Sequence, residues 1–149
     1  MTLVANSYKS KTLVTWLALL GGSIGLHRWY LRGRPDAWTI LHALPTTLGL
    51  YGVWRMLEKG QDDPLAWLLI PVLGLMLAGT QLLAIVYGLT PDERWNVRYN
   101  AASIRKHQSS GLVIVGVVWA LMLGTGILMA TLAFSMQRFF EWQQMPSIS

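Results

Sequence analysis

Apolar residues gather into four segments separated by polar stretches. The segments cover residues 12–26, 37–56, 65–89 and 112–134. A helix rises about 1.5 Å per residue, so about 20 residues cross a hydrocarbon layer of about 30 Å. The last three segments have this length, whereas the first reaches it only by extending towards Lys9 and Lys11 or through residues 27–31. The pattern predicts four transmembrane helices.

The first segment has a second interpretation as a signal peptide, because lysines precede an apolar run. A signal peptide ends at a small-x-small cleavage site. Here the run meets Gly25-Leu26-His27-Arg28 instead, which favours an uncleaved helix. The short connections 27–36 and 57–64 favour antiparallel neighbours. We therefore expect an all-α fold, an antiparallel four-helix membrane bundle.

The third connection, residues 90–111, is longer and contains a helix-start pattern. Thr90 suits the N-cap, Pro91 the first helical position, and Glu93 would close a capping box. We expect a short interfacial helix at about 91–103, on the membrane surface between helices 3 and 4. An ordinary polar loop with one helical turn is the alternative.

Composition agrees with a membrane protein. Of the 149 residues, 53% are hydrophobic and only 13% charged, about half the charged share of a soluble domain. The net charge of +5 suits Lys and Arg that face anionic lipids in cytoplasmic loops, and no nucleic-acid partner is expected. The chain has no cysteine, which excludes disulfides and thiolate metal sites.

The positions of Lys and Arg predict the orientation. In the four-helix arrangement seven lie in the connections 27–36 and 90–111, and five lie on the other side. Cytoplasmic loops carry the excess, so both termini are expected on the non-cytoplasmic side. Lys9 and Lys11 oppose this assignment, because they stand directly before the first helix.

Arginine and aromatic residues are dense just after the first apolar segment, and similar residues recur in the third connection. Guanidinium groups bind phosphate bidentately, and Trp and Tyr rings settle at head-group depth. Both connections should fall on the same membrane face. We expect a lipid- or partner-binding site there, with plain topology and lipid anchoring as the alternative. Its residues are His27, Arg28, Trp29, Tyr30, Arg32, Arg34, Trp95, Arg98 and Tyr99.

Small and polar residues inside the segments predict helix contacts. Gly21, Gly22 and Gly25 form a face that another helix can approach closely, and we expect the second helix there. Thr80 and Gln81 suit hydrogen bonds between helices.

Two histidines have competing interpretations. His27 suits a cap on the free carbonyls of a helix end, or else a pH-sensitive group or metal ligand. His42 suits a hydrogen bond to carbonyls freed by Pro45. A proton relay at His42 would need further titratable groups at the same depth, and the sequence suggests none.

The stretch from Lys9 to Trp54 resembles the TM-2 domain family, small membrane modules of two helices. The likeness rests on Lys9-Ser10-Lys11, the glycine-rich helix end, the order Gly25, His27, Arg28, Trp29, Tyr30, Gly33, and Gly49-Leu50-Tyr51-Gly52-Val53-Trp54. It covers about residues 9–60. Arg32 interrupts the usual Tyr-Leu-Gly order. The family usually has an aspartate a few residues after the tryptophan of the second helix, and here Glu58 is the nearest acid, slightly displaced. The resemblance implies a TM-2-like helix pair over 1–60, a second pair over 61–149, and a bacterial membrane protein.

No nucleophile, carboxylate pair, phosphate loop or metal-ligand spacing occurs. We therefore expect a non-enzymatic protein of the bacterial cytoplasmic membrane without cofactor or metal, an accessory subunit that binds other membrane proteins, itself or anionic lipids. The alternative is a small transporter or channel. Its path would be lined by His42, Thr46, Gln81 and Trp119.

Overall fold

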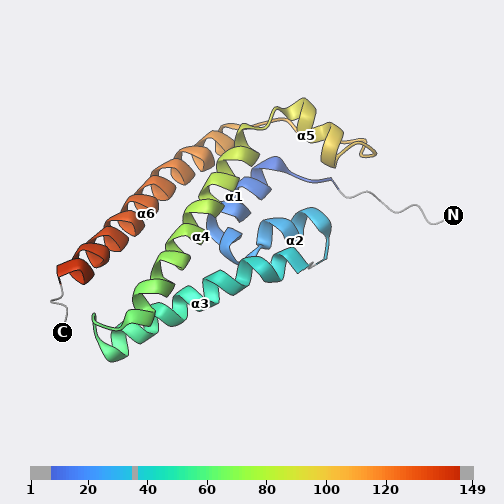
Figure 1. Cartoon of the computed structure of the whole chain (residues 1–149). Helices are drawn as coiled ribbons and strands as arrows, with labels where there is room; N and C mark the ends of the chain where they lie inside the picture. The colour runs from blue at the N-terminus through green and yellow to red at the C-terminus, as the bar shows by residue number, and fades with distance from the viewer. Residues whose placement is uncertain (1–7, 35–36, 145–149) are drawn as a thin grey trace.

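The computed structural model describes residues 8–34 and 37–144, and within them every regular element is helical (Figure 1). This confirms the all-α prediction. The elements are α1 (Lys11–Gly21), the 3₁₀ turn η1 (Gly22–Ile24), α2 (Leu26–Arg32), α3 (Ala37–Lys59), α4 (Pro64–Leu89), α5 (Asp92–Tyr99) and α6 (Gly111–Gln144).

Helix α4 is the centre of the molecule and packs against α1, α3 and α6. Small residues make the close approaches possible. On the α3 side, a Cβ added to Gly52 would lie 2.6 Å from the Cβ of Leu69. On the α1 and α6 sides, Ala18, Ala84 and Ala120 form a fully buried cluster. Contacts between backbones through Gly and Ala are typical of helices that associate in lipid.

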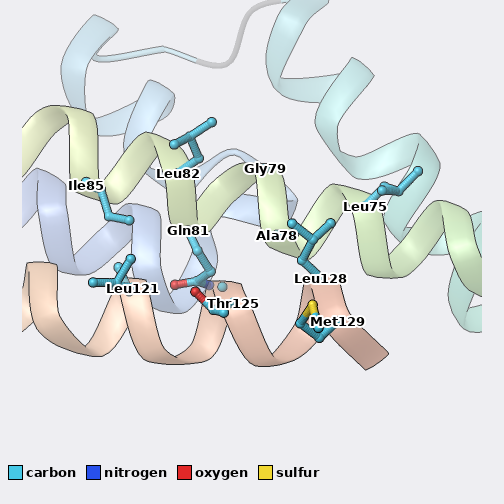
Figure 2. Close-up of a pocket in the computed structure, with 12 residues that line it drawn as sticks. Leu75, Ala78, Gly79, Gln81, Leu82, Ile85, Leu121, Thr125, Leu128 and Met129 are labelled. Atoms are coloured by element: carbon cyan, nitrogen blue, oxygen red, sulfur yellow. The ribbon is translucent and has the colours of Figure 1, made fainter. Parts of the chain in front are cut away.

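Two helices, α4 and α6, are long and apolar enough to cross a membrane. Only 17% of the most apolar stretch of each is buried inside the molecule. The core helix of a soluble protein would bury most of such a surface. A groove between α4 and α6 is likewise lined by apolar side chains (Figure 2). These features point to membrane association.

The prediction of one continuous helix over residues 12–26 is wrong. Helix α1 ends at Gly21, η1 follows, and Gly25 turns the chain with a left-handed φ of +79°. Helix α2 then returns to the start of α1, where the Lys9 ammonium donates to the carbonyl of Tyr30 (2.7 Å). The backbone N–H of Ser10 donates to the Tyr30 hydroxyl (3.1 Å). Residues 8–32 therefore form a helical hairpin, here called the N-terminal hairpin, whose two ends meet.

The predicted bundle of four antiparallel spans changes accordingly. The described residues contain three long helices, α3, α4 and α6, and the shorter N-terminal hairpin (Figure 1). The hairpin packs against α4 and α6 as well as α3. The two predicted helix pairs, 1–60 and 61–149, therefore share one packed unit.

The short helix in the third connection is present as α5, and it is shorter than the predicted 91–103. The predicted capping box is absent, because the Thr90 hydroxyl donates back to the carbonyl of Val86 (2.7 Å). Pro91 occupies the N-cap position without a side-chain cap. Trp95, expected at the membrane surface, is fully buried.

Replacing Gly25 with alanine should destabilise the fold more than the same change at Gly33. Both glycines have positive φ, which costs an L-residue about 1–2 kcal/mol. At Gly25 the new Cβ would also lie 2.9 Å from Thr39 Cγ2 and 3.2 Å from its Cα, whereas at Gly33 it meets nothing within 4 Å. Thermal unfolding in detergent, followed by circular dichroism, measures both. Equal losses would show that the turn tolerates the closer approach.

Candidate functional site

The N-terminal hairpin and the α4–α6 connection meet at one end of the molecule. The Lys11 ammonium donates to the carbonyl of Thr90 (2.8 Å) and pairs with Asp92 (2.6 Å). We call the end formed by residues 8–11, 28–34 and 90–111 the basic end. It holds nine of the twelve Lys and Arg residues, namely Lys9, Lys11, Arg28, Arg32, Arg34, Arg94, Arg98, Arg105 and Lys106.

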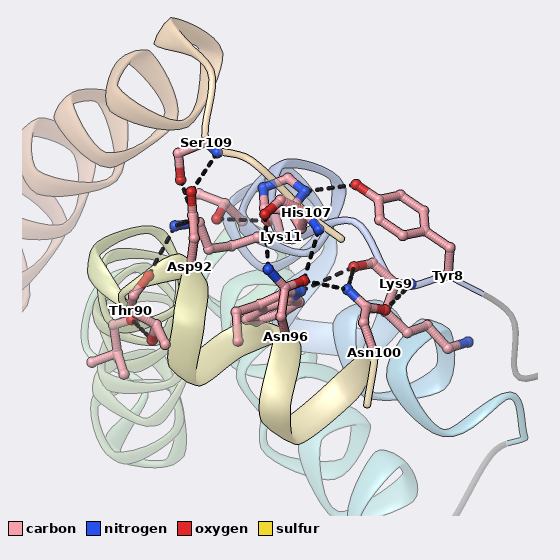
Figure 3. Close-up of polar contacts among 12 residues, drawn as sticks. Tyr8, Lys9, Lys11, Thr90, Asp92, Asn96, Asn100, His107 and Ser109 are labelled. Carbon is pink, nitrogen blue, oxygen red and sulfur yellow. Dashed lines mark hydrogen bonds and ion pairs between the residues drawn. The ribbon is translucent and has the colours of Figure 1, made fainter. Parts of the chain in front are cut away.

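Asp92 joins the hairpin to the start of α6 (Figure 3). Its carboxylate accepts from Lys11, whose side chain is only 3% exposed, and from the backbone N–H (2.7 Å) and hydroxyl (2.6 Å) of Ser109. Burial opposes ionisation of Asp92, but the bonds from Lys11 and Ser109 outweigh it, and the pKa falls to about 2. The Asp92 carboxyl is therefore ionised at neutral pH.

Two asparagines one turn apart, Asn96 on α5 and Asn100 at its C-cap, hold the backbone of two other segments. The Asn100 amide accepts from the Lys9 N–H (2.8 Å) and donates to the Lys9 carbonyl (3.1 Å). Asn96 makes the same pair of bonds with His107, at 2.7 and 2.9 Å. The Trp95 indole also donates to the Lys9 carbonyl (2.9 Å). The start of the hairpin is thus fixed to α5.

Three of the predicted site residues, Arg28, Arg32 and Arg98, belong to the basic end. Two of them come from α2 and one from α5, and Arg32 and Arg98 are exposed. Arg98 lies over the Tyr99 ring, with its guanidinium carbon 5.4 Å from the ring centroid. We call Arg28, Arg32 and Arg98 the arginine cluster. Such a cluster can hold an anion by charge and by bidentate hydrogen bonds.

The other predicted residues have different surroundings. Trp29 and Arg34 are exposed. Tyr30 instead secures the hairpin through its bonds to Lys9 and Ser10. Trp95 is buried and packs against Tyr99, with ring centroids 4.4 Å apart. Tyr30 and Trp95 therefore hold the fold together, whereas Arg32, Arg98 and Trp29 are exposed.

His27 does not cap a helix end as expected. It is fully buried, and neither ring nitrogen has a hydrogen-bond partner. Its ring lies 5.7 Å from those of both His42 and Tyr87, measured between centroids. His42 Nδ1 donates to the carbonyl of Trp38 (2.8 Å), not to a carbonyl freed by Pro45. The sequence suggested no titratable neighbours for His42, because the three rings come from three different helices.

The helix-packing glycines have separate roles, since α1 ends at Gly21. A Cβ on Gly21 would meet Leu26 of the hairpin itself. A Cβ on Gly22 would lie 2.7 Å from Thr80 Cβ of α4, and Gly25 touches Thr39 of the expected second helix. The close approach to other helices therefore occurs at Gly22 and Gly25.

Within the described ranges no group of three His, Asp or Glu side chains is placed to hold a metal ion. No family model matches the chain, and no curated protein and no solved structure matches it significantly. The likeness of residues 9–60 to TM-2 domains therefore rests on those residues alone.

Changing Asp92 to asparagine should destabilise the protein by about 3 kcal/mol, because it leaves the buried Lys11 ammonium unpaired. The pKa of Asp92 falls from 3.8 to about 2 on folding. The wild-type protein therefore keeps this contribution above about pH 4 and loses it as the pH falls towards 2. Thermal unfolding in detergent between pH 7 and pH 2.5 should show this acid limb in the wild type and a weaker one in Asp92→Asn. The double variant Lys11→Met/Asp92→Asn should recover part of the loss; no recovery would argue against the ion pair as the cause.

Proposed function

We propose that the protein is an integral membrane protein in which α3, α4 and α6 span the bilayer and the N-terminal hairpin enters and leaves on one side. The 23 residues of α3 extend about 35 Å at about 1.5 Å per residue, enough to cross. The exposed apolar surfaces of α4 and α6 support insertion.

The break in the hairpin is compatible with membrane depth because its free backbone groups are bonded within the protein. The carbonyl of Leu19 accepts from the Gln81 side chain (3.0 Å), and that of Ser23 accepts from the Thr46 hydroxyl (2.7 Å). Irregular backbone inside a bilayer is tolerated only where it is buried in protein and satisfied. These two bonds favour a re-entrant hairpin.

The hairpin also changes the expected orientation. Residues 8–11 now lie with the two basic connections, so nine Lys and Arg residues face three at the other end, Arg55, Lys59 and Arg138. This excess assigns the basic end to the cytoplasm. With three spans the N-terminus is cytoplasmic and the C-terminus lies outside. The sequence predicted both termini on the non-cytoplasmic side; the proposal keeps this for the C-terminus and moves the N-terminus to the cytoplasm.

We infer that the arginine cluster binds the phosphate of an anionic lipid at the cytoplasmic surface. The observation that supports this most is the gathering of nine of the twelve Lys and Arg residues at the basic end, where Arg32 of α2 and Arg98 of α5 are both exposed. Charge-assisted bonds from guanidinium to phosphate are among the strongest hydrogen bonds. The protein would act without chemistry, as an accessory component of the bacterial cytoplasmic membrane.

The transport alternative has less support. Thr46 is bonded to the hairpin and Gln81 to the end of α1. Trp119 is 50% exposed on the surface of α6.

Cysteine labelling in intact bacteria tests the topology cleanly, because the chain has no cysteine of its own. A membrane-impermeant maleimide should label Gln61→Cys in intact cells. It should label Ile104→Cys, and a cysteine in a tag ahead of Met1, only after lysis. Labelling of the tag but not of Ile104→Cys in intact cells would restore four spans. Recovery of the chain in the soluble fraction would refute insertion.

The double variant Arg32→Gln/Arg98→Gln should bind phosphatidylglycerol about tenfold more weakly. A hydrogen bond to a charged group contributes about 1.5–3 kcal/mol, and the loss of about 1.4 kcal/mol of binding free energy raises the Kd tenfold. Native mass spectrometry of the protein in uncharged detergent, titrated with phosphatidylglycerol, measures the affinity.

The matched control is Arg94→Gln/Arg105→Gln, which removes the same charge from the same end. Equal weakening in both variants would indicate that net charge alone attracts lipid. If the Arg32→Gln/Arg98→Gln variant kept its lipid affinity but no longer bound an acidic partner protein, the site would be a protein-binding site instead.

A further inference from the structure

His27 is a fully buried histidine whose ring makes no hydrogen bond. In the described part of the chain neither Nδ1 nor Nε2 has a partner, and the residue is 0% exposed. A buried polar group without a partner is costly, and a bound ion or water molecule is one of the explanations for such a group in a native protein. The surroundings of His27 therefore point to something bound beside it.

His42 presents a second unused ring nitrogen close to His27. Its Nδ1 donates to the carbonyl of Trp38, so the neutral ring carries its lone pair on Nε2. Nothing in the ranges that the structure describes bonds to this Nε2. Histidines that bind metals have the same arrangement, because the N–H opposite the metal usually donates to a carbonyl or a carboxylate.

Tyr87 brings a third group from α4. Its ring centroid lies 5.7 Å from that of His27, the same distance as the centroid of His42. The Tyr87 hydroxyl makes no hydrogen bond to any residue within 8–34 and 37–144. The three side chains thus come from α2, α3 and α4, and each has a nitrogen or oxygen atom that the fold leaves unused.

The spacing of the three rings suits one shared metal ion. A metal about 2.0–2.1 Å from a nitrogen of each of two imidazoles holds their centroids about 5.2 Å apart at a tetrahedral angle and about 6.4 Å apart in a straight line. The 5.7 Å between His27 and His42 lies between these limits. For an imidazole and a phenolate the same arithmetic gives about 6 Å, close to the 5.7 Å between His27 and Tyr87.

We propose that His27, His42 and Tyr87 bind a divalent transition-metal ion of the zinc class, with water in the remaining position. The imidazoles bind through neutral nitrogens, and the Tyr87 hydroxyl releases its proton to solvent, so that a phenolate oxygen meets the metal. An anionic ligand is needed because Arg28, next to His27 in the chain, repels a second positive charge. Nitrogen and oxygen donors with one position left to water are a known ligand set of zinc.

The site is shallow, so an ion can reach it from water. His42 lies five residues after Ala37, where α3 begins, and Tyr87 lies three residues before Thr90. At about 1.5 Å per residue these positions are about 8 Å and about 5 Å from the basic end. Both side chains are partly exposed whereas His27 is buried, so the ion enters beside His42 and Tyr87. The proposal does not require any helix to span the bilayer.

Zinc titration of the full-length protein tests the proposal, in uncharged detergent and without a polyhistidine tag. After treatment with a chelator, the wild type should bind one Zn²⁺ per chain in competition with a chromophoric chelator. Its thermal unfolding temperature should rise with Zn²⁺, because a ligand that binds only the folded protein stabilises it.

Two histidine variants make the result specific. His42→Gln should weaken zinc binding about 100-fold, since the loss of an outer-shell partner alone costs about 10–100-fold. His107→Gln removes the third histidine of the chain, which bonds to Tyr8 instead, and as the matched control it should keep the wild-type affinity. His27→Gln should also lose zinc. Because His27 is buried and its replacement can prevent folding, the partly exposed His42 decides the test.

Copper reports on the tyrosine separately. Cu²⁺ accepts the same imidazole donors, and a phenolate bound to it gives a visible charge-transfer absorption. This absorption should appear when Cu²⁺ is added to the wild type and disappear in Tyr87→Phe. Tyr99→Phe, which removes a hydroxyl from the neighbouring helix α5, is the control and should keep it. A purely structural role of Tyr87 would produce no such band.

Zinc affinities that are equal in the wild type and His42→Gln would overturn the proposal. Absence of zinc binding by folded wild-type protein would also overturn it and would assign the place beside His27 to water. A copper band that persists in Tyr87→Phe would refute the tyrosine ligand. The Gln61→Cys labelling and the lipid titration of Arg32→Gln/Arg98→Gln do not depend on zinc, so the proposals fail separately.

Discussion

The need to satisfy the backbone where the N-terminal hairpin breaks determines much of the structure. A helix that ends inside the molecule leaves carbonyls without partners, and in lipid each carries a cost of several kcal/mol. Gln81 of α4 and Thr46 of α3 supply the missing donors to Leu19 and Ser23. These two helices therefore hold the break in the hairpin between them, and Gln81 of α4 lies where α1 ends because it bonds Leu19 there.

The basic end completes this arrangement from outside. Because α2 returns, the first turn of α1 must be held where the chain enters, and α5 does this through Asp92, Trp95 and Asn100. Because Trp95 of α5 bonds the Lys9 carbonyl, its ring is buried and does not face the lipid. Lys9 bonds both Asn100 and Tyr30, so the same contacts bring α2 and α5, with their arginines, to the basic end. The contacts that fix the hairpin are thus the same contacts that bring the residues of the arginine cluster to one end of the molecule.

The sequence predicted the long helices well and the hairpin poorly, for physical reasons. Residues 65–89 and 112–134 are uncharged runs whose length alone defines a helix. In residues 12–26 the glycines permit either a packed continuous helix or a turn, and only the partners in α3 and α4 decide between them. The pairing of Lys9 with Asn100, and the grouping of His27, His42 and Tyr87, depend on contacts between distant segments that no local pattern contains.

The arginines of α2 stay with residues 90–111 whether the first segment crosses the membrane or returns, because they follow the turn in either case. A first helix that crossed the membrane would place Arg28 and Arg32 with residues 90–111, and so does a hairpin that returns. Only Lys9 and Lys11 change sides, which turns a nearly even distribution of charge into nine against three. Lysines that appeared to oppose the orientation thus become its strongest support, since the Lys11–Asp92 pair keeps the start of the hairpin at the basic end.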